Sequence, residues 1–267
     1  GFVLPRGPTV STTTTTTRKG FAMYYPDQLR TVYPVHSDGL HVIRPATSIR
    51  KLTAVNYEIR PQKSGPAKAK NISLFVKKGP FRNMGLYVVT LEEITTCPDS
   101  CSLKVLVRVN GQPVCYGANT PFAIRYAVGP GLLLAFDHDL ETLTNRATRA
   151  HRPGFVVRLH ELGDFPDHDY IDYWVHALEA FPLLHVFGYS HHTGALADHL
   201  DAVWDQYPGR FVVRDSDAVH GAGPRTPAVV GARPGFVPCP QQRTQTPSCI
   251  TCGLCMNTTT PISFDAH

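Results

Sequence analysis

The stretch "GFVVRLHELGDFPDHDYIDYWVHALEAFPLLHVFGYS", residues 154–190, contains one repeating unit of an α/β fold. It begins with a β-prone apolar run and its exit loop, "GFVVRLHELGDF", and it ends with a second apolar run, "LLHVFGYS". Between the two runs, Asp167 can cap a helix, because its side chain can accept a backbone N–H at the helix start. One face of that helix would carry Ile171, Trp174, Val175 and Leu178. The stretch therefore predicts a strand, a helix and a strand in close succession.

The same alternation continues on both sides of this unit. Upstream, "GLYVVTLEE" at 85–93 is β-rich, and Asp137 can cap a helix that runs to about Arg149. Downstream, "RFVVRDSD" at 210–217 predicts a third strand, and "ALADHLDAVWDQY" at 195–207 predicts a helix with one apolar face, made of Leu196, Leu200, Val203 and Trp204. Short connections between strands and helices imply parallel strands with right-handed crossovers. The predicted fold class is α/β, a partial barrel or open parallel sheet with a βαβαβ core.

The two ends of the chain differ from this core. Residues 1–80 hold 13 Lys/Arg against three acidic residues, a balance of 13 − 3 = +10, which leaves 13 − 18 = −5 for the remainder. Because these residues include the polar tract "STTTTTT" at 11–17, we predict a basic, partly irregular N-terminal arm, with a strand at "LHVIR". The predicted division is this arm, an α/β core at 81–235, and a Cys-rich segment at 236–267 that packs on the core.

The basic arm suggests a class of partner. A cluster of Lys and Arg is suited to a polyanion such as nucleic acid, although a solubilising arm accounts for the charge equally well. The chain has no run near the roughly 18 apolar residues that a membrane helix needs. We therefore expect a cytoplasmic protein with nucleic acid as a candidate partner and no membrane partner.

Polar side chains follow each predicted strand of the core. The first strand leads to Arg158, His160 and Asp164. The second strand leads to Tyr189, Ser190, His191 and His192. The third strand leads to Arg214, Asp215, Asp217 and, further on, His220. Because the carboxyl ends of parallel strands share one edge of a sheet, a site would be built there.

Several of these residues are candidates for catalysis, although each could instead cap a helix or tighten a turn. A histidine beside a carboxylate, His160 with Asp164, could move a proton near neutral pH. Arg158 is suited to a bidentate grip on a phosphate or carboxylate. The set of candidate catalytic residues is Arg158, His160, Asp164, Tyr189 and His191.

Seven cysteines form two sets, and the larger set lies near the C-terminus. An odd number of clustered cysteines argues against a disulfide framework and favours metal binding. The spacing C-x2-C-x2-C in "CITCGLC", with a distant cysteine beside a proline in "PCP", favours a four-iron, four-sulfur cluster over zinc. With four thiolates the cluster would be fully ligated, so it would hold structure or carry electrons. The predicted ligands are Cys239, Cys249, Cys252 and Cys255.

The other set, Cys97, Cys101 and Cys115, predicts a different role. Three cysteines can hold a cluster and leave one iron open to a substrate or to S-adenosylmethionine. A hairpin signal at Asn110-Gly111 would return Cys115 toward the other two. Cys97-x3-Cys101 shares its spacing with radical S-adenosylmethionine enzymes, although the long interval before Cys115 departs from their triplet. A zinc site completed by a histidine remains an equal alternative.

Several motifs occur together that resemble the phage and bacterial gene product 88 family. They are "TCPDSC", "CYGANTPFAIR", "FVVRLHELGDF" with "YIDYWVHAL", "HVFGYS", and "CGLC" with "TTTPISFDAH". The resemblance extends from about residue 75 to the C-terminus. It implies a phage or mobile-element context and assigns no role to any residue. The chain departs from the family pattern in the hairpin before Cys115 and in Met256, where an aromatic residue is usual.

Together these features predict an iron-sulfur protein with one or two four-iron, four-sulfur clusters. The predicted function is an enzyme that carries out redox or radical-type chemistry on a nucleotide or nucleic acid. The first alternative is a nucleic-acid-binding module that zinc stabilises and that has no catalytic role. A second alternative is an electron carrier without a substrate.

Overall fold

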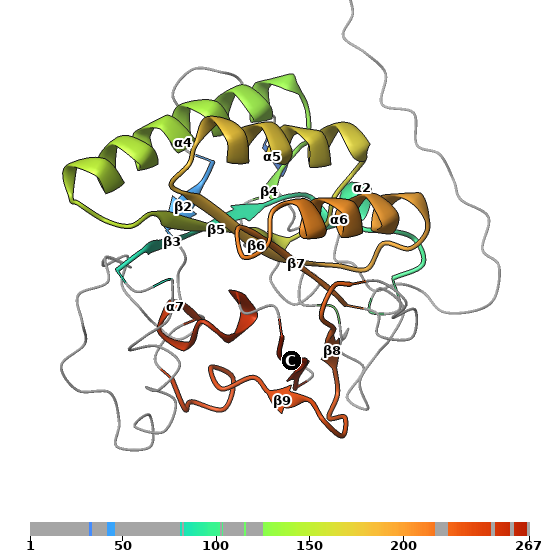
Figure 1. Ribbon diagram of the computed structural model, residues 1–267. Helices are drawn as coiled ribbons and strands as arrows, with labels where there is room; N and C mark the ends of the chain where they lie inside the picture. Colours follow the sequence, from blue (N-terminus) through green and yellow to red (C-terminus); the bar gives the residue numbers. More distant parts are fainter. Residues whose placement is uncertain are drawn as a thin grey trace, which may run out of the picture.

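An open five-stranded sheet forms the centre of the molecule (Figure 1). The computed structural model describes residues 32–33, 42–45, 81, 83–101, 103, 115, 125–216, 224–246, 249–256 and 259–265. The strands, in their order across the sheet, are β2 (Arg44–Pro45), β3 (Gly85–Thr90), β5 (Phe155–Leu162), β6 (Leu184–Ser190) and β7 (Phe211–Asp215). β2 is antiparallel to β3, and the other four strands are parallel. The predicted α/β class is confirmed as an open sheet, and the described strands form no closed barrel.

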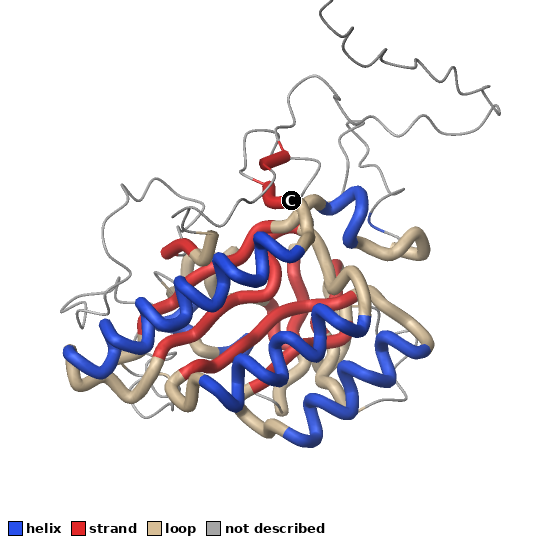
Figure 2. The backbone as a smooth tube through the Cα atoms, turned by 90° about the horizontal axis from the view of Figure 1, so that it is seen from above, coloured by secondary structure: helices blue, strands red, loops and turns tan. Residues whose placement is uncertain are grey.

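Three long helices cover one face of this sheet (Figures 1 and 2). They are α4 (Pro130–Arg149), α5 (His168–Ala180) and α6 (Ala195–Gln206). Each parallel strand lies beside the previous one in chain order, so right-handed crossovers place every helix on the same side. The core between the helices and the sheet includes Phe136, Trp174, Leu178, Leu200 and Val203.

Two of the helix starts can be compared with their predicted caps. Asp167 is the N-cap of α5, because its Oδ1 accepts a hydrogen bond from the Tyr170 amide at 2.8 Å, as predicted. The prediction for α4 was wrong at its start: the helix begins at Pro130, seven residues before Asp137. Proline is favoured in the first turn because its missing N–H needs no partner there. The carboxylate of Asp137 instead accepts a hydrogen bond from the Tyr173 hydroxyl at 2.8 Å.

The C-terminal segment lies against the opposite face of the sheet (Figure 1). It contains a small parallel sheet in the order β8-β10-β9 and two short helical turns. Their bounds are Ala228–Val230 for β8, Val237–Pro238 for β9, Cys249–Cys252 for α7, Leu254–Met256 for the 3-10 helix η3, and Ile262–Phe264 for β10. A second apolar cluster joins this segment to the large sheet, with Val88, Val156, Phe187 and Val212 packed against Ile250, Leu254, Met256 and Ile262.

Strand β5 changes the direction of its side chains near its end. Phe155, Val157 and Leu159 pack toward the helices, whereas Val156 packs toward the C-terminal segment. The pairing with β3 then becomes irregular, because Val88 pairs with Arg158 but Thr90 pairs with Leu162. Between these two pairs one residue of β3 therefore opposes three of β5, and strict alternation ends. This irregularity decides which of the polar residues at the end of β5 lie together.

Several predictions fall outside the described residues. They concern the Asn110-Gly111 hairpin, the polar residues Asp217 and His220, and most of the N-terminal arm. In the described part of that arm, β1 (Val32–Tyr33) pairs with β4 (Arg125–Tyr126), and β2 overlaps the predicted strand at residue 44. The helices that the structure describes include none with the length and apolarity to cross a bilayer.

Candidate functional site

Four thiols come together on the side of the sheet opposite the long helices. Cys239 follows β9, Cys249 and Cys252 lie in α7, and Cys255 lies in η3. Cys239, Cys252 and Cys255 belong to one apolar cluster, and Cys249 packs against it, which places all four in one group. All seven cysteines are among the described residues, and none forms a disulfide.

Burial strongly affects the protonation of these thiols. Burial, followed by the neighbouring thiolates, raises the pKa of Cys249 to about 12, and burial raises the pKa of Cys252 to about 12 as well. Burial also raises the pKa of Cys239. Metal binding requires thiolates, so a bound metal would have to displace these protons. Cys239, Cys249 and Cys252 are therefore protonated at neutral pH unless a positive centre lies among them.

The backbone turns sharply between α7 and η3. Gly253 has φ 69°, a left-handed value that few residues other than glycine adopt. Its amide donates to the Cys249 carbonyl at 2.7 Å, and the Met256 amide donates to the Gly253 carbonyl at 3.1 Å. These hydrogen bonds hold the two turns in a compact loop.

Arg214 anchors this loop to the end of β7. Its buried guanidinium donates from Nε to the Cys255 carbonyl at 2.9 Å and from Nη2 to the Leu254 carbonyl at 3.0 Å. A third hydrogen bond runs from Nη1 to the Thr260 carbonyl at 2.8 Å. Arg214 was singled out as a polar residue at a strand end, and these three hydrogen bonds show that it holds the C-terminal segment in place.

Arg158 and Tyr189 lie between the sheet and the thiols. Cζ of Arg158 is 5.7 Å from the centre of the Tyr189 ring, and Tyr189 packs against the apolar cluster that contains Cys255. Burial alone would lower the pKa of Arg158, but the pKa is raised overall, because negative charge on Tyr189, Glu161, Cys249 and Cys255 favours the cation. Burial, followed by Cys255, raises the pKa of Tyr189. Nε of Arg158 is buried, and none of the described residues accepts a hydrogen bond from it.

His160 lies on the other side of the sheet, among aromatic side chains. Its Nε2 is 2.9 Å from the Tyr170 hydroxyl, and its ring centre is 5.0 Å from that of Phe165. Burial, followed by the charges of Arg158 and His192, lowers the pKa of His160 to about 3. The imidazole is therefore neutral at neutral pH. Within the described residues no hydrogen bond joins it to Asp164, so the two do not form the predicted pair.

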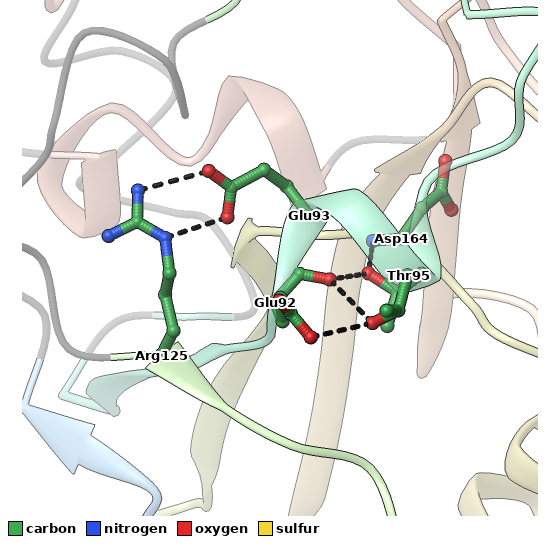
Figure 3. A network of polar contacts seen from close by, with 6 residues as sticks. Glu92, Glu93, Thr95, Arg125 and Asp164 are labelled. Carbon is green, nitrogen blue, oxygen red and sulfur yellow. Dashed lines mark hydrogen bonds and ion pairs between the residues drawn. The ribbon is translucent and has the colours of Figure 1, made fainter. Parts of the chain in front are cut away.

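Asp164 connects three elements at the carboxyl edge of the sheet. Its Oδ1 and Oδ2 accept hydrogen bonds from the amides of Phe165 and His191, both at 2.8 Å. Its own amide donates to Oγ1 of Thr96 at 3.1 Å, which ties the loop after β5 to α2 (Glu93–Thr96) (Figure 3). His192 Nε2 lies 3.9 Å from Oδ1. Burial raises the pKa of this carboxyl, although the nearby histidine and the two amides oppose the shift.

The first cysteine set begins immediately after α2. Cys97 is the C-cap of this helix, and Cys101 is buried four residues later. Glu93 in the helix forms a bidentate ion pair with Arg125 of β4, at 2.7 Å and 3.0 Å (Figure 3). The structure describes Cys115 without its neighbours in the chain, so the assembly of this set stays a prediction.

Sequence reasoning did not identify the ion pair of Glu93 with Arg125 or the contact of Thr96 with Asp164. Both charged residues stand beside apolar, β-prone runs, "YVVTLEE" and "FAIRYAV", and that position is the available signal for burial. Glu93 and Arg125 are 32 residues apart in the sequence, and local sequence spacing does not predict a contact over that distance.

The protonation of His160 gives a testable dependence of stability on pH. The unfolded imidazole has a pKa near 6.5 and the folded one near 3, so between these values only the unfolded chain binds the proton. Stability is then lost as the pH falls. From about pH 6.5 to about pH 4.5 the loss through this group is about 2–3 kcal/mol. Glutamine does not titrate. In urea unfolding, the His160→Gln variant is therefore expected to lose about 2–3 kcal/mol less stability than the wild type over this pH range.

The matched control for this measurement is His138→Gln, which removes an exposed imidazole from α4. An equally steep loss of stability in the wild type and in His160→Gln would contradict a buried, neutral His160.

Among the residues that the structure describes, no three or more Cys, His, Asp or Glu side chains are arranged to hold a metal ion.

Comparison with known proteins gives one family. The family model described as gene product 88 matches residues 61–214, which include the first cysteine set, β5 and β6. The match ends before the C-terminal cysteines, so the resemblance of "CGLC" and the residues after it is not part of it. The similarity of Cys97-x3-Cys101 to radical S-adenosylmethionine enzymes is not supported. Searches of curated proteins and of solved structures gave no significant match. Because the match covers more than half of the 267 residues, the chain belongs to the gene product 88 family.

Proposed function

We propose that Cys239, Cys249, Cys252 and Cys255 hold a four-iron, four-sulfur cluster, and that the protein uses this cluster in electron transfer. The packing of four thiols in one part of the fold next to Arg158, a half-buried cation whose Nε is buried, carries this proposal. A cluster bound by four thiolates has a net negative charge, and a low-dielectric environment favours a positive group beside it.

The spacing of the cysteines in the sequence supports a cluster more than a single zinc ion. Cys249, Cys252 and Cys255 form C-x2-C-x2-C, and Cys239 stands beside a proline, which resembles the ligand pattern of four-iron, four-sulfur proteins. In such a cluster each thiolate binds a different iron. All four residues belong to one apolar cluster or pack against it, which brings them to the same part of the fold.

The unpartnered Nε of Arg158 gives a second, independent argument. A buried N–H without an acceptor is unfavourable, because it has lost its hydrogen bonds to water. Arg158 lies near Cys249 and Cys255, where a cluster would bring thiolate and sulfide sulfur. A sulfur acceptor there would complete the hydrogen bonding of the guanidinium.

The proposed reaction is redox chemistry on a nucleotide or a nucleic acid. Four protein ligands leave no open iron, so the C-terminal cluster would pass electrons and would not bind substrate. The proposal of a polyanionic substrate rests on the excess positive charge of residues 1–80. A second, reactive centre at Cys97, Cys101 and Cys115 is part of the same proposal.

Metal counting on protein purified without oxygen tests the cluster. We expect about four iron and four acid-labile sulfide per chain from the C-terminal set. Cys249→Ser and Cys252→Ser are expected to lose that complement, because each removes one ligand and leaves an oxygen of similar size. Cys101→Ser is the matched control, since it alters a thiol of the other set and leaves the four C-terminal ligands in place. Protein without iron and sulfide would refute the proposal.

The second candidate function is a zinc-stabilised nucleic-acid-binding module without catalysis. The observation that favours it is that Cys239, Cys252 and Cys255 belong to the apolar cluster that joins the C-terminal segment to the sheet. A zinc ion there would serve only to fix this segment. Zinc as the sole metal, with salt-sensitive DNA binding that persists in Arg158→Gln, would favour this function.

A further inference from the structure

The environment of the C-terminal thiols differs on its two sides. On one side the thiols contact apolar residues such as Ile250 and Met256. On the sheet side they face a cation and a hydroxyl, from Arg158 and Tyr189. We infer that Arg158 and Tyr189 raise the reduction potential of the cluster, an inference that rests on the proposed function.

Arg158 and Tyr189 are held in place by the sheet itself. They belong to neighbouring strands, β5 and β6, whose pairing continues to Leu159 and Gly188. The guanidinium carbon is 5.7 Å from the tyrosine ring centre, so the ring limits where the cation can move. Tyr189 also packs against the apolar cluster that contains Cys239, Cys252 and Cys255. One rigid pair therefore places both a positive charge and a hydroxyl group beside the thiols.

The direction of the effect follows from the charge of the cluster. Reduction by one electron, from an external donor such as dithionite, adds one negative charge and requires no proton. A fixed cation attracts the reduced cluster more strongly than the oxidised one, and low dielectric strengthens that difference. Hydrogen bonds to cluster sulfur act in the same direction, because they stabilise added electron density. Both side chains thus favour the reduced form.

Other charged groups nearby have different tasks. Negative charge on Cys255 also favours the charged form of Arg214. The N–H groups of Arg214, however, donate to the carbonyls of Cys255, Leu254 and Thr260. Glu161 lies near Arg158 and partly offsets its charge. Arg158 is therefore the cation whose buried Nε has no acceptor among the described residues and remains available to sulfur.

Three substitutions separate the contributions of charge and hydrogen bonding. Arg158→Gln removes the positive charge. Arg158→Lys keeps the charge but provides fewer N–H donors. Tyr189→Phe keeps the ring beside Arg158 and removes only the hydroxyl. If Arg158 merely filled space, Arg158→Gln and Arg158→Lys would have the same potential.

The experiment is an anaerobic potentiometric titration of each full-length variant, followed by visible absorption and by paramagnetic resonance of the reduced cluster. At a fixed applied potential, Arg158→Gln is expected to lower the ratio of reduced to oxidised cluster about tenfold, which is about 59 mV for one electron. Arg158→Lys should recover most of this shift, and Tyr189→Phe should show a smaller negative shift.

The matched controls remove the same groups elsewhere. Arg243→Gln deletes an exposed cation of the C-terminal segment, and Tyr207→Phe deletes a hydroxyl that donates to Glu179 on the helical side. Unchanged potentials in both Arg158→Gln and Tyr189→Phe, with iron and sulfide retained, would overturn the inference. If the Arg158→Gln variant cannot assemble a cluster, the reduction potential of the Tyr189→Phe variant alone tests the inference. Absence of iron and sulfide from the wild type would instead overturn the proposed function.

Discussion

Arg214→Met is expected to lower the free energy of unfolding by about 3–5 kcal/mol, because it removes a buried charge whose N–H groups satisfy two buried carbonyls and a partly buried one. The guanidinium is fully buried, and its three hydrogen bonds go to Cys255, Leu254 and Thr260. Methionine has a side chain of similar length but no hydrogen-bond donor. The three carbonyls would then have to move toward water, which would separate the loop of thiols from the sheet.

This substitution has a matched control at the other end of the same strand. Arg210 precedes β7 and donates to the carbonyls of Leu178, Phe181 and Leu184, all on the helical side. Arg210 is partly exposed, so water can replace some of these bonds, and Arg210→Met is expected to cost about 1–3 kcal/mol.

Unfolding in urea, together with metal content, separates the two arginines. Arg214→Met should lose both stability and the metal of the C-terminal cysteines, whereas Arg210→Met should lose stability alone. Equal loss of metal in the two variants would show that general destabilisation, and not the anchoring of the loop, controls the site.

The order and direction of the strands could be predicted because they depend on local pattern. Apolar runs near 155, 184 and 211 alternate with amphipathic segments, and short connections permit only right-handed crossovers between parallel strands. The cap at Asp167 was also predictable, since the acceptor and the amide it satisfies are three residues apart. The start of α4 was not, because Pro130 competes with Asp137 as a start signal and tertiary packing decides between them.

The faces on which the polar side chains at the end of β5 lie were less predictable. Period-two alternation would place Arg158 and His160 on one face, and both were expected to share a site. The irregular pairing between β3 and β5 sends His160 to the helices, where Tyr170 and Phe165 surround it. A register change of this kind depends on the neighbouring strand, so a single strand's sequence does not reveal it.

The convergence of the C-terminal cysteines shows what spacing can and cannot indicate. Cys249, Cys252 and Cys255 lie within two turns of chain, so their proximity follows from local geometry. Their relation to Arg158 depends on the long-range packing of the loop on the sheet, which Arg214 secures. The proximity of these three cysteines could therefore be predicted, whereas the residues that lie beside them required the fold.

Breaking the ion pair of Glu93 with Arg125 is expected to cost about 3–5 kcal/mol for either single substitution, because each leaves one buried charge without its partner. The exposed fractions of the two side chains are 3% and 0%, and the bidentate geometry joins α2 to β4. Glu93→Gln and Arg125→Met test the two halves. The pair lies directly before Cys97, so its loss should also displace the first cysteine set.

A double-mutant cycle distinguishes the pair from two unrelated contacts. Glu93→Gln with Arg125→Met should cost less than the sum of the single changes, with a coupling energy of about 2–3 kcal/mol in urea unfolding. The exposed pair of Arg243 with Asp265, at 3.2 Å and 43% and 57% exposed, is the matched comparison. Solvent screening should keep its coupling energy below about 1 kcal/mol. Additive single changes at Glu93 and Arg125 would show that the two charges are satisfied independently, and α2 would then owe its position to Thr96 and Asp164 instead.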